Sequence, residues 1–242
     1  MINFLLTRYQ FSSFFSLPEN MMLDFAYPLG AVFVYLGVLV VIADVLSRLL
    51  PKDPELTRKI VHIGSGNVIL LAWWFNISRQ VIVSAAIIAA AIAITSYIIP
   101  ILPSIESVGR KSFGTLFYAI SIGVLSACFW QTSPQYTVIG ILIMAWGDGM
   151  AAIIGQRFGR HTYKIGEITK SWEGSLAMAT ASFAVSELVL LSVEGNSWHI
   201  LLISIIVALI ATILEAFSKL GIDNLSVPLG SGFICFLCLQ AL

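Results

Sequence analysis

The stretch VIVSAAIIAAAIAITSYIIPIL (residues 81–102) is apolar along its whole length and carries no charged side chain. A helix needs about 20 mostly apolar residues to cross the hydrocarbon core of a bilayer, so this stretch predicts a membrane-spanning helix. Seven other stretches have the same character: Phe25–Ser47, Ile60–Phe75, Phe113–Trp130, Tyr136–Ile154, Trp172–Ser192, Trp198–Phe217 and Val227–Leu242. Two of them, Ile60–Phe75 and Val227–Leu242, are short, so seven spans are the alternative. We therefore predict an all-α integral membrane protein, a bundle of about eight transmembrane helices.

The amino-acid composition excludes an ordinary soluble domain. Of the 242 residues, 58% are hydrophobic and 11% are charged, whereas a soluble domain carries about 25% charged residues. The surplus apolar surface must face lipid. The formal net charge is zero, and we expect no nucleic-acid partner. Cys235 and Cys238 form a CxxC pair without a second pair or a nearby histidine, so we interpret them as packing residues.

The basic residues fall almost entirely on one side of the predicted spans. Lysine and arginine favour cytoplasmic loops. One side holds Arg48, Lys52, Arg58, Lys59, Arg110, Lys111, Arg157, Arg160, Lys164, Lys170 and Lys219, and the other holds Arg8 and Arg79. We predict that the first side is cytoplasmic and that both termini are extracytoplasmic. Residues 1–22 lack the basic start and long apolar core of a secretory signal, so we expect a dispensable extension before one transmembrane domain over residues 23–242.

Ionisable side chains in or beside the spans gather on the cytoplasmic side. A charge at the centre of a membrane costs roughly 3 kcal/mol on insertion scales, so such residues are functional candidates. The candidates are Arg58, Lys59, His62, Asp148, Glu173, Glu215, Asp223 and Asn224. Headgroup anchoring is the alternative for Arg58 and Lys59, and helix capping is the alternative for Glu215 and Asp223. Neither explains Asp148.

Asp148 lies between Gly147 and Gly149. Glycines let the backbone approach a ligand closely. Mg²⁺ usually takes one or two carboxylates and completes its shell with water and substrate phosphate. We therefore predict that Asp148 is a Mg²⁺ ligand. The alternative is a buried carboxylate paired with a neighbouring helix.

The segment GQRFGRHTYKIGEITK (residues 155–170) is rich in glycine and basic residues. Exposed amides and cations suit polyphosphate, and Ser171 is a candidate N-cap whose helix start favours an anion. The pattern is not a Walker A loop. The predicted phosphate-binding residues are Gly147, Gly155, Gly159, Lys164, Lys170, Ser171, Gly174, Ser175, Asp223 and Asn224. A positive-inside loop would explain the charges but not the glycines.

Taken in order, three sets of motifs resemble the polyprenol kinase family over roughly residues 40–230. They are Arg58-Lys59-x-x-His62-x-x-x-Gly66; Gly147-Asp148-x-x-Ala151-x-x-x-Gly155 followed by Gly159, Lys164 and Lys170-Ser171-x-Glu173-Gly174-Ser175; and Glu215, Asp223-Asn224 and Pro228. The family includes phytol, dolichol and CTP-dependent diacylglycerol kinases. The tract Gly109-Arg110-Lys111-Ser112-Phe113-Gly114 is most similar to the phytol kinases.

The resemblance implies phosphoryl transfer from a nucleoside triphosphate, usually CTP, to a lipid alcohol. The family's functional positions match Arg58, Lys59, Asp148 and Gly155 of this sequence. With phytol as acceptor, the product would be phytyl phosphate for tocopherol or other prenyl-lipid synthesis. Such a transfer needs positioning and charge neutralisation more than covalent chemistry, which fits a polar site at the helix ends.

We accordingly expect Mg²⁺ on Asp148 and phosphate oxygens on Lys164, Lys170 and the helix start at Ser171. In this mechanism Arg58 and Lys59 neutralise the transferred group, and His62, Glu173 or Glu215 accepts the proton of the alcohol. The alternatives are other acceptors (farnesol, geranylgeraniol, dolichol or diacylglycerol), a cytidylyltransferase that forms a CDP-lipid, and a transporter. The membrane is expected to be a prokaryotic plasma or thylakoid-type membrane.

Overall fold

The computed structural model describes residues 19–51, 53–98 and 113–241. Its elements are α2 (Glu19–Leu49), α3 (Pro54–Gly66), α4 (Val68–Trp74), α5 (Arg79–Ile98), α6 (Gly114–Phe129), α7 (Pro134–Leu142), the π-helix η1 (Ile143–Asp148), α8 (Gly149–Phe158), β1 (Thr162–Ile165), β2 (Ile168–Ser171), α9 (Trp172–Glu194), α10 (Trp198–Ala216) and α11 (Asp223–Ala241). The expected N-terminal extension up to residue 18, Lys52 and the tract from Gly109 to Ser112 lie outside the described residues.

The all-α membrane class is confirmed. Within the described ranges, six helical segments are long and apolar enough to cross a membrane: Ala26–Leu49, Arg79–Ser96, Pro134–Phe158, Trp172–Glu194, Trp198–Ala216 and Asp223–Ala241. The other two expected spans are also helical, but α6 is shorter, and the helix from Pro54 to Trp74 is interrupted at Asn67.

Local sequence signals fix several helix starts. Asp53 precedes Pro54, the first residue of α3, and its Oδ1 accepts a hydrogen bond from Leu56 N at 3.0 Å. Ser171 caps α9 in the same way, because its Oγ accepts from Gly174 N at 3.1 Å. Both are the N-cap geometry that short polar side chains favour, so the predicted cap at Ser171 is confirmed.

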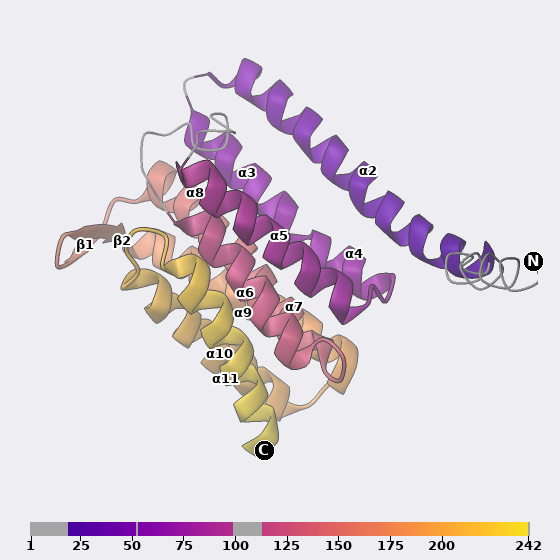
Figure 1. Cartoon of the computed structure of the whole chain (residues 1–242). Coiled ribbons are helices and arrows are strands. Elements are labelled where there is room, and N and C mark those ends of the chain that lie inside the picture. The colour runs from indigo at the N-terminus through magenta and orange to yellow at the C-terminus, as the bar shows by residue number, and fades with distance from the viewer. Residues whose placement is uncertain (1–18, 52, 99–112, 242) are drawn as a thin grey trace, which may run out of the picture.

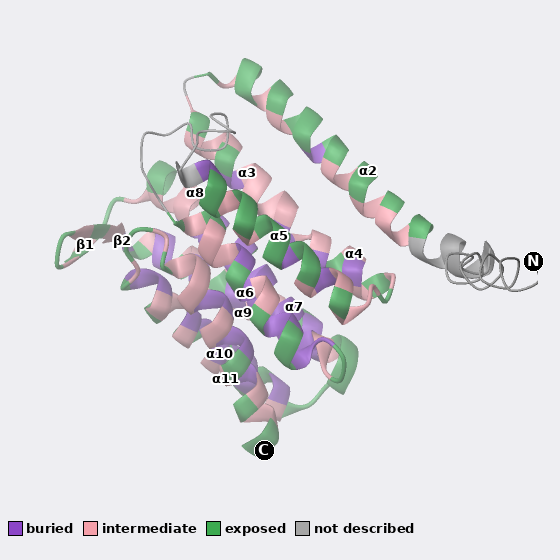
Figure 2. Cartoon of the chain, in the orientation of Figure 1, coloured by how far each residue is buried: buried purple, intermediate pink, exposed green. Residues whose placement is uncertain are grey.

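The continuous helix α7–η1–α8 forms the centre of the bundle, and α2 lies at its edge (Figures 1 and 2). Val138, Ile139, Ile143 and Met144 are fully buried there. In contrast, Leu39 is the one buried side chain among residues 26–49 of α2. That exposed apolar surface suits a helix that faces lipid.

The segment from Gly155 to Lys170 differs from the expected loop. Helix α8 continues to Phe158, and β1 then pairs antiparallel with β2, so that Ile165 faces Ile168 across a two-residue turn. Gly166 adopts φ +58° in this turn, a conformation that glycine reaches without steric cost. The segment reads as a loop in sequence because its strands are only four residues long.

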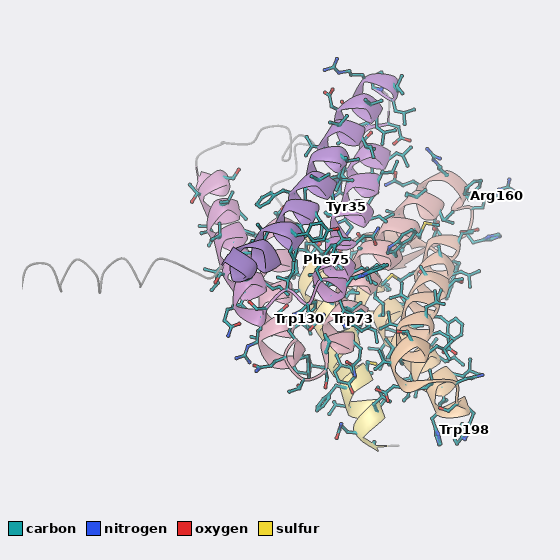
Figure 3. All side chains as sticks on the ribbon, turned by 90° about the vertical axis from the view of Figure 1, so that its right-hand side faces the viewer. Tyr35, Trp73, Phe75, Trp130, Arg160 and Trp198 are labelled. Atoms are coloured by element: carbon teal, nitrogen blue, oxygen red, sulfur yellow. The ribbon has the colours of Figure 1, made fainter. Side chains whose placement is uncertain are left out.

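When α3–α4 and α7–η1–α8 are each taken as one segment, successive helical segments alternate in direction, so the connections gather at two ends of the bundle. The segments after α2, α8 and α10 lie at the end that carries β1 and β2 (Figure 1). Trp73, Trp130 and Trp198 lie toward the opposite end from Arg160 (Figure 3). Tryptophan is enriched where a membrane meets water, so this distribution fits a bundle that crosses a bilayer between the two ends.

Candidate active site

The centre of the site is a buried ion pair between two helices. Lys59 Nζ of α3 lies 2.6 Å from Asp148 Oδ2 at the end of η1. Lys59 is 6% exposed and Asp148 is 7% exposed. Lys59 also lines a cavity of about 170 Å³ beside Ile153 and Gln156 of α8. The pair is therefore buried, and its lysine borders a cavity at the end of the bundle that carries β1 and β2.

His62 lies one turn after Lys59 and faces the same carboxylate. Its Nε2 is 3.7 Å from Asp148 Oδ2 and 3.4 Å from the carbonyl oxygen of Met144. Residues three and four apart share a face of a helix, and the candidate residues Lys59 and His62 lie together on this face of α3. The structure adds the second helix that this face meets.

That second helix is a π-helix, which sequence reasoning did not predict. In a π-helix the hydrogen bonds reach one residue further than in an α-helix, and such turns are frequent at functional sites. Residues 143–148 form six consecutive residues of this kind and end at Asp148. No periodicity of apolar residues distinguishes so short a segment from an α-helix, so the sequence carried no signal for it.

Glycines allow the helices around Asp148 to pack closely. A Cβ at Gly147 would lie 2.6 Å from Met178 Sδ of α9, and one at Gly149 would lie 2.5 Å from Ile63 Cγ1 of α3. These two glycines therefore serve helix packing, and the ligand contact expected from the sequence remains a prediction. The ion pair with α3 matches the alternative interpretation of Asp148, and a role in binding metal remains a prediction.

A second ion pair joins the hairpin to α10. Lys170 Nζ of β2 contacts Glu215 Oε1, and Glu215 is 4% exposed. Lys170, Glu215 and Asp223 lie close enough to Asp148 for their charges to act on it. We call Lys59, His62, Asp148, Lys170, Glu215 and Asp223 the polar cluster.

The predicted glycines and serines after Asp148 form the contact between α8 and α9. A Cβ at Gly174 would lie 2.9 Å from Ala151 O, and one at Gly159 would lie 2.8 Å from Ser171 Oγ; a Cβ at Gly155 would lie 3.1 Å from the same oxygen. Ser175 Oγ is 2.6 Å from the Tyr163 hydroxyl of β1. These residues hold the start of α9 and the hairpin beside the polar cluster.

Three other predicted residues make no hydrogen bond to the polar cluster in the described part of the chain. Arg58 donates to Glu55 Oε2 at 2.8 Å, and this hydrogen bond raises the pKa of its guanidinium. Glu173 accepts from His161, with Nδ1 at 2.7 Å and the backbone nitrogen at 3.2 Å. Lys164 is exposed.

Asn224 closes the cluster from the side of α11. Its backbone oxygen accepts a hydrogen bond from Ser121 Oγ of α6 at 2.8 Å, and its backbone nitrogen donates to Asp223 Oδ1 at 3.0 Å. Helix α6 therefore contacts the start of α11 next to a carboxylate of the polar cluster.

The chain is 51% identical over 208 residues to the phytol kinase of Synechocystis sp., which covers 86% of this chain and 89% of that protein. Phytol kinase 1, chloroplastic, of Arabidopsis thaliana is 31% identical over 232 residues, covering 86% and 75%. The probable phytol kinase, chloroplastic, of Triticum aestivum is 30% identical over 214 residues, covering 80% and 71%. The chain belongs to the phytol kinase family. The family resemblance and the expected kinase class are thereby confirmed. Neither a protein-family model nor a solved structure matches the chain.

A phosphoryl-transfer site in a phytol kinase relative needs oxygen ligands for Mg²⁺. No group of three or more His, Cys, Asp or Glu side chains that could hold a metal ion occurs among the described residues. Mg²⁺ needs only one or two carboxylates when phosphate and water complete its shell. The carboxylate of Asp148 is a donor of the kind it prefers, so this residue fits the ion.

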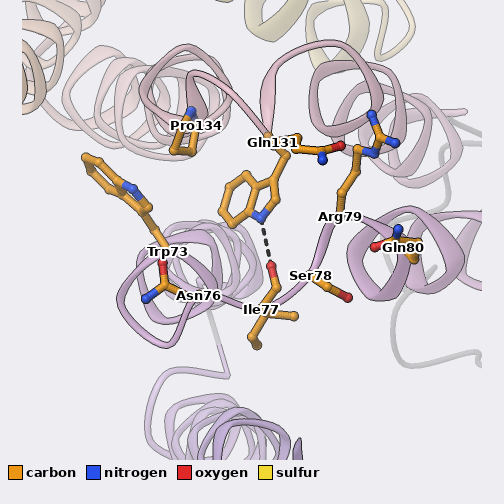
Figure 4. A pocket seen from close by; sticks show the side chains of 9 residues that line it. Trp73, Asn76, Ile77, Ser78, Arg79, Gln80, Gln131 and Pro134 are labelled. Carbon is orange, nitrogen blue, oxygen red and sulfur yellow. Dashed lines mark hydrogen bonds between the residues drawn. The ribbon is translucent and has the colours of Figure 1, made fainter.

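A cavity of about 250 Å³ lies at the opposite end of this phytol kinase relative, between the α4–α5 and α6–α7 connections (Figure 4). Trp130 Nε1 donates to Ile77 O at 2.7 Å and holds the two connections together. Arg79 is the one charged residue of the lining. Without a carboxylate or histidine this cavity lacks the groups that phosphoryl transfer needs, which leaves the polar cluster as the candidate active site.

Proposed function

We propose that the chain transfers a phosphoryl group from CTP to phytol and forms phytyl phosphate for prenyl-lipid synthesis, including tocopherol. The observation that carries the proposal is the buried Lys59–Asp148 pair with His62 beside it, at the end of the bundle where the basic residues gather. The relatives that bear the name phytol kinase support the choice of acceptor. The choice of CTP rests on the resemblance of the motifs to the polyprenol kinases.

The cations of the polar cluster suit a triphosphate. Lys59 is paired with Asp148, and Lys170 is paired with Glu215. In this proposal the triphosphate binds beside both lysines. Lysine binds phosphate as a point charge. In this proposal both ammonium groups contact phosphate oxygens when the nucleotide enters beside α8, where Lys59 lines a cavity.

Asp148 is the residue that would hold Mg²⁺, with water and the phosphate oxygens of the nucleotide completing the shell of the ion. Bound there, the ion would neutralise charge on the transferred group and the leaving group. Arg58 adds positive charge at the mouth of the site from its pair with Glu55.

Of the three candidate bases, His62 has the most suitable place. It lies 3.7 Å from Asp148 Oδ2, whereas Glu173 is bonded to His161 and Glu215 is bonded to Lys170. The alcohol oxygen attacks the γ-phosphorus, the bond to the β–γ bridging oxygen breaks, CDP leaves, and the alcohol proton passes to His62.

A site at the ends of spanning helices suits two substrates of opposite character. The hydroxyl of a lipid alcohol lies near the membrane surface, and the nucleotide arrives from water. We place the site at the cytoplasmic face of a prokaryotic plasma or thylakoid-type membrane; the chloroplastic names of plant relatives support the second of these.

The test uses purified protein in detergent with Mg²⁺ and phytol, and CTP labelled on either the α- or the γ-phosphorus. The γ-label in a lipid monophosphate supports the proposal. The α-label in a lipid product would instead establish a cytidylyltransferase, and no labelled lipid would overturn both. Parallel assays with ATP, farnesol, dolichol and diacylglycerol measure donor and acceptor preference, and the Asp148→Asn variant controls for contaminating kinases.

A further inference from the structure

Tyr118 of α6 has a hydroxyl that the bundle does not satisfy. Its Oη is buried and has no hydrogen-bond partner among the described residues. A buried polar group without a partner is costly, and each such group in a native structure calls for an explanation. The unpaired serine and threonine hydroxyls of the described helices differ from it, because such side chains can reach carbonyls of their own helix. A tyrosine hydroxyl lies too far from its own backbone to do so.

The position of this hydroxyl connects it to the polar cluster. The rings of Tyr118 and His62 lie 5.4 Å apart, centroid to centroid. A Cβ built on Gly66 would lie 3.2 Å from Tyr118 Oη, and Gly66 follows His62 by one helical turn on the same face of α3. The unsatisfied hydroxyl therefore lies against α3, within about one helical turn of the group to which we assign the alcohol proton.

Helix α6 also provides the apolar surroundings that a lipid alcohol needs. It carries no charged side chain, and Ile120 and Val124 are each 37% exposed on its outer surface. In a membrane that surface faces acyl chains. Tyr118 thus belongs to a helix with lipid-facing surface, and its ring contacts His62 of the polar cluster.

We propose that Tyr118 Oη donates a hydrogen bond to the hydroxyl oxygen of the acceptor alcohol and places that oxygen beside His62. The inference rests on the proposed kinase function. The alcohol oxygen accepts from Tyr118 through one lone pair, its proton points to His62, and its other lone pair attacks the γ-phosphorus. The O–P bond forms as the bond to the β–γ bridging oxygen breaks, His62 takes the proton, and CDP leaves.

Tyr118→Phe is the decisive variant because it removes one oxygen and keeps the ring. We expect kcat/KM for phytol to fall by at least about ten-fold, which corresponds to about 1.4 kcal/mol of lost transition-state stabilisation, while KM for CTP stays within about two-fold. Since the hydroxyl has no hydrogen-bond partner within the described part of the chain, the melting temperature should stay the same or rise.

Tyr35→Phe is the matched control. The Tyr35 hydroxyl of α2 donates to Gly64 O of α3, the helix that carries His62, at 2.8 Å. Removal of this hydroxyl should lower the melting temperature and leave KM for phytol unchanged. A Tyr118→Phe enzyme with wild-type kcat/KM for phytol would overturn the inference while the proposed function stands. So would a lower melting temperature with kcat and both KM values changed in parallel. Absence of phytyl phosphate with the wild-type protein would overturn both.

Discussion

Lys59 and Asp148 form their ion pair out of contact with most water. Burial removes the hydration of both charges, and their mutual attraction often does no more than offset that loss. Such a pair is weak evidence for stability. It is better explained by a site in which Lys59 exchanges its carboxylate partner for phosphate and Asp148 becomes free for a cation.

Breaking the pair from one side should destabilise the protein, and removing both charges should not. Lys59→Met and Asp148→Asn each leave a buried group unpaired, at a cost of about 3–5 kcal/mol when the remaining group stays charged. We expect lower melting temperatures for both variants and a recovered melting temperature for the double variant, with no kinase activity in any of the three. Scanning fluorimetry in detergent and the γ-label assay measure the two properties. A double variant that recovers activity would exclude both residues from the chemistry.

Replacing either His62 or Glu173 with glutamine tests which of these two candidate bases accepts the alcohol proton. A general base contributes about 10²–10⁴-fold to rate, so His62→Gln should lose at least about 100-fold in kcat. The Glu173–His161 contact lies at the surface of the hairpin, where water screens an ion pair and leaves it little net strength. Glu173→Gln should therefore keep kcat within about five-fold. The reverse order of losses would transfer the role of base to Glu173.

At the scale of elements, the site depends on the contact between α3 and η1. Gly66 makes this contact possible, because a Cβ there would lie 2.2 Å from Ala145 Cβ. Trp146 Nε1 adds a hydrogen bond to Asn67 Oδ1 at 2.9 Å, where α3 gives way to α4. The two helices thus approach each other near His62. Neither continues there as a regular α-helix, because α3 ends at Gly66 and η1 is a π-helix.

Gly66→Ala should separate α3 from η1. Overpacking of this kind costs about 1–3 kcal/mol, and the separation should also reduce activity because Lys59 and His62 move away from Asp148. Adding Ala145→Gly removes the clashing Cβ and should restore both the melting temperature and kcat. Gly37→Ala on α2 is the control, since nothing lies within 4 Å of its Cβ. A Gly66→Ala protein with wild-type stability and rate would show that this contact does not position the site.

The sequence predicts an element wherever one property, such as hydrophobicity or charge, persists over a long stretch. Runs of apolar residues located the helices, and charge located the end of the bundle that carries the polar cluster. It does not predict which side chains meet. Glu173 and Lys170 are three residues apart, yet one bonds to His161 and the other to Glu215. Tyr118 has no neighbouring motif, and only its buried hydroxyl beside His62 singles it out.

At the scale of the whole molecule, the alternation of the helices places most basic residues at one end. Arg48 lies in the last turn of α2 and Arg157 in the last turn of α8. Lys170 is on β2, and Lys219 lies between α10 and α11. Arg79 begins α5 at the other end. A bundle with this asymmetry should insert with its basic end in the cytoplasm, which is the side from which a nucleotide arrives.

Cysteine labelling in spheroplasts tests this orientation. The exposed Cys128 and the partly exposed Cys238 are first replaced by serine, which leaves only the buried Cys235. One new cysteine is then placed either at Lys164 on β1 or at Gln131 before α7, both exposed positions. A membrane-impermeant maleimide should label Gln131→Cys in intact spheroplasts, and should label Lys164→Cys only after permeabilisation, because the hairpin and the polar cluster share the cytoplasmic end. Labelling of Lys164→Cys from outside would place the polar cluster at the extracytoplasmic face, away from cellular nucleotide, and would contradict the proposed kinase reaction along with the orientation.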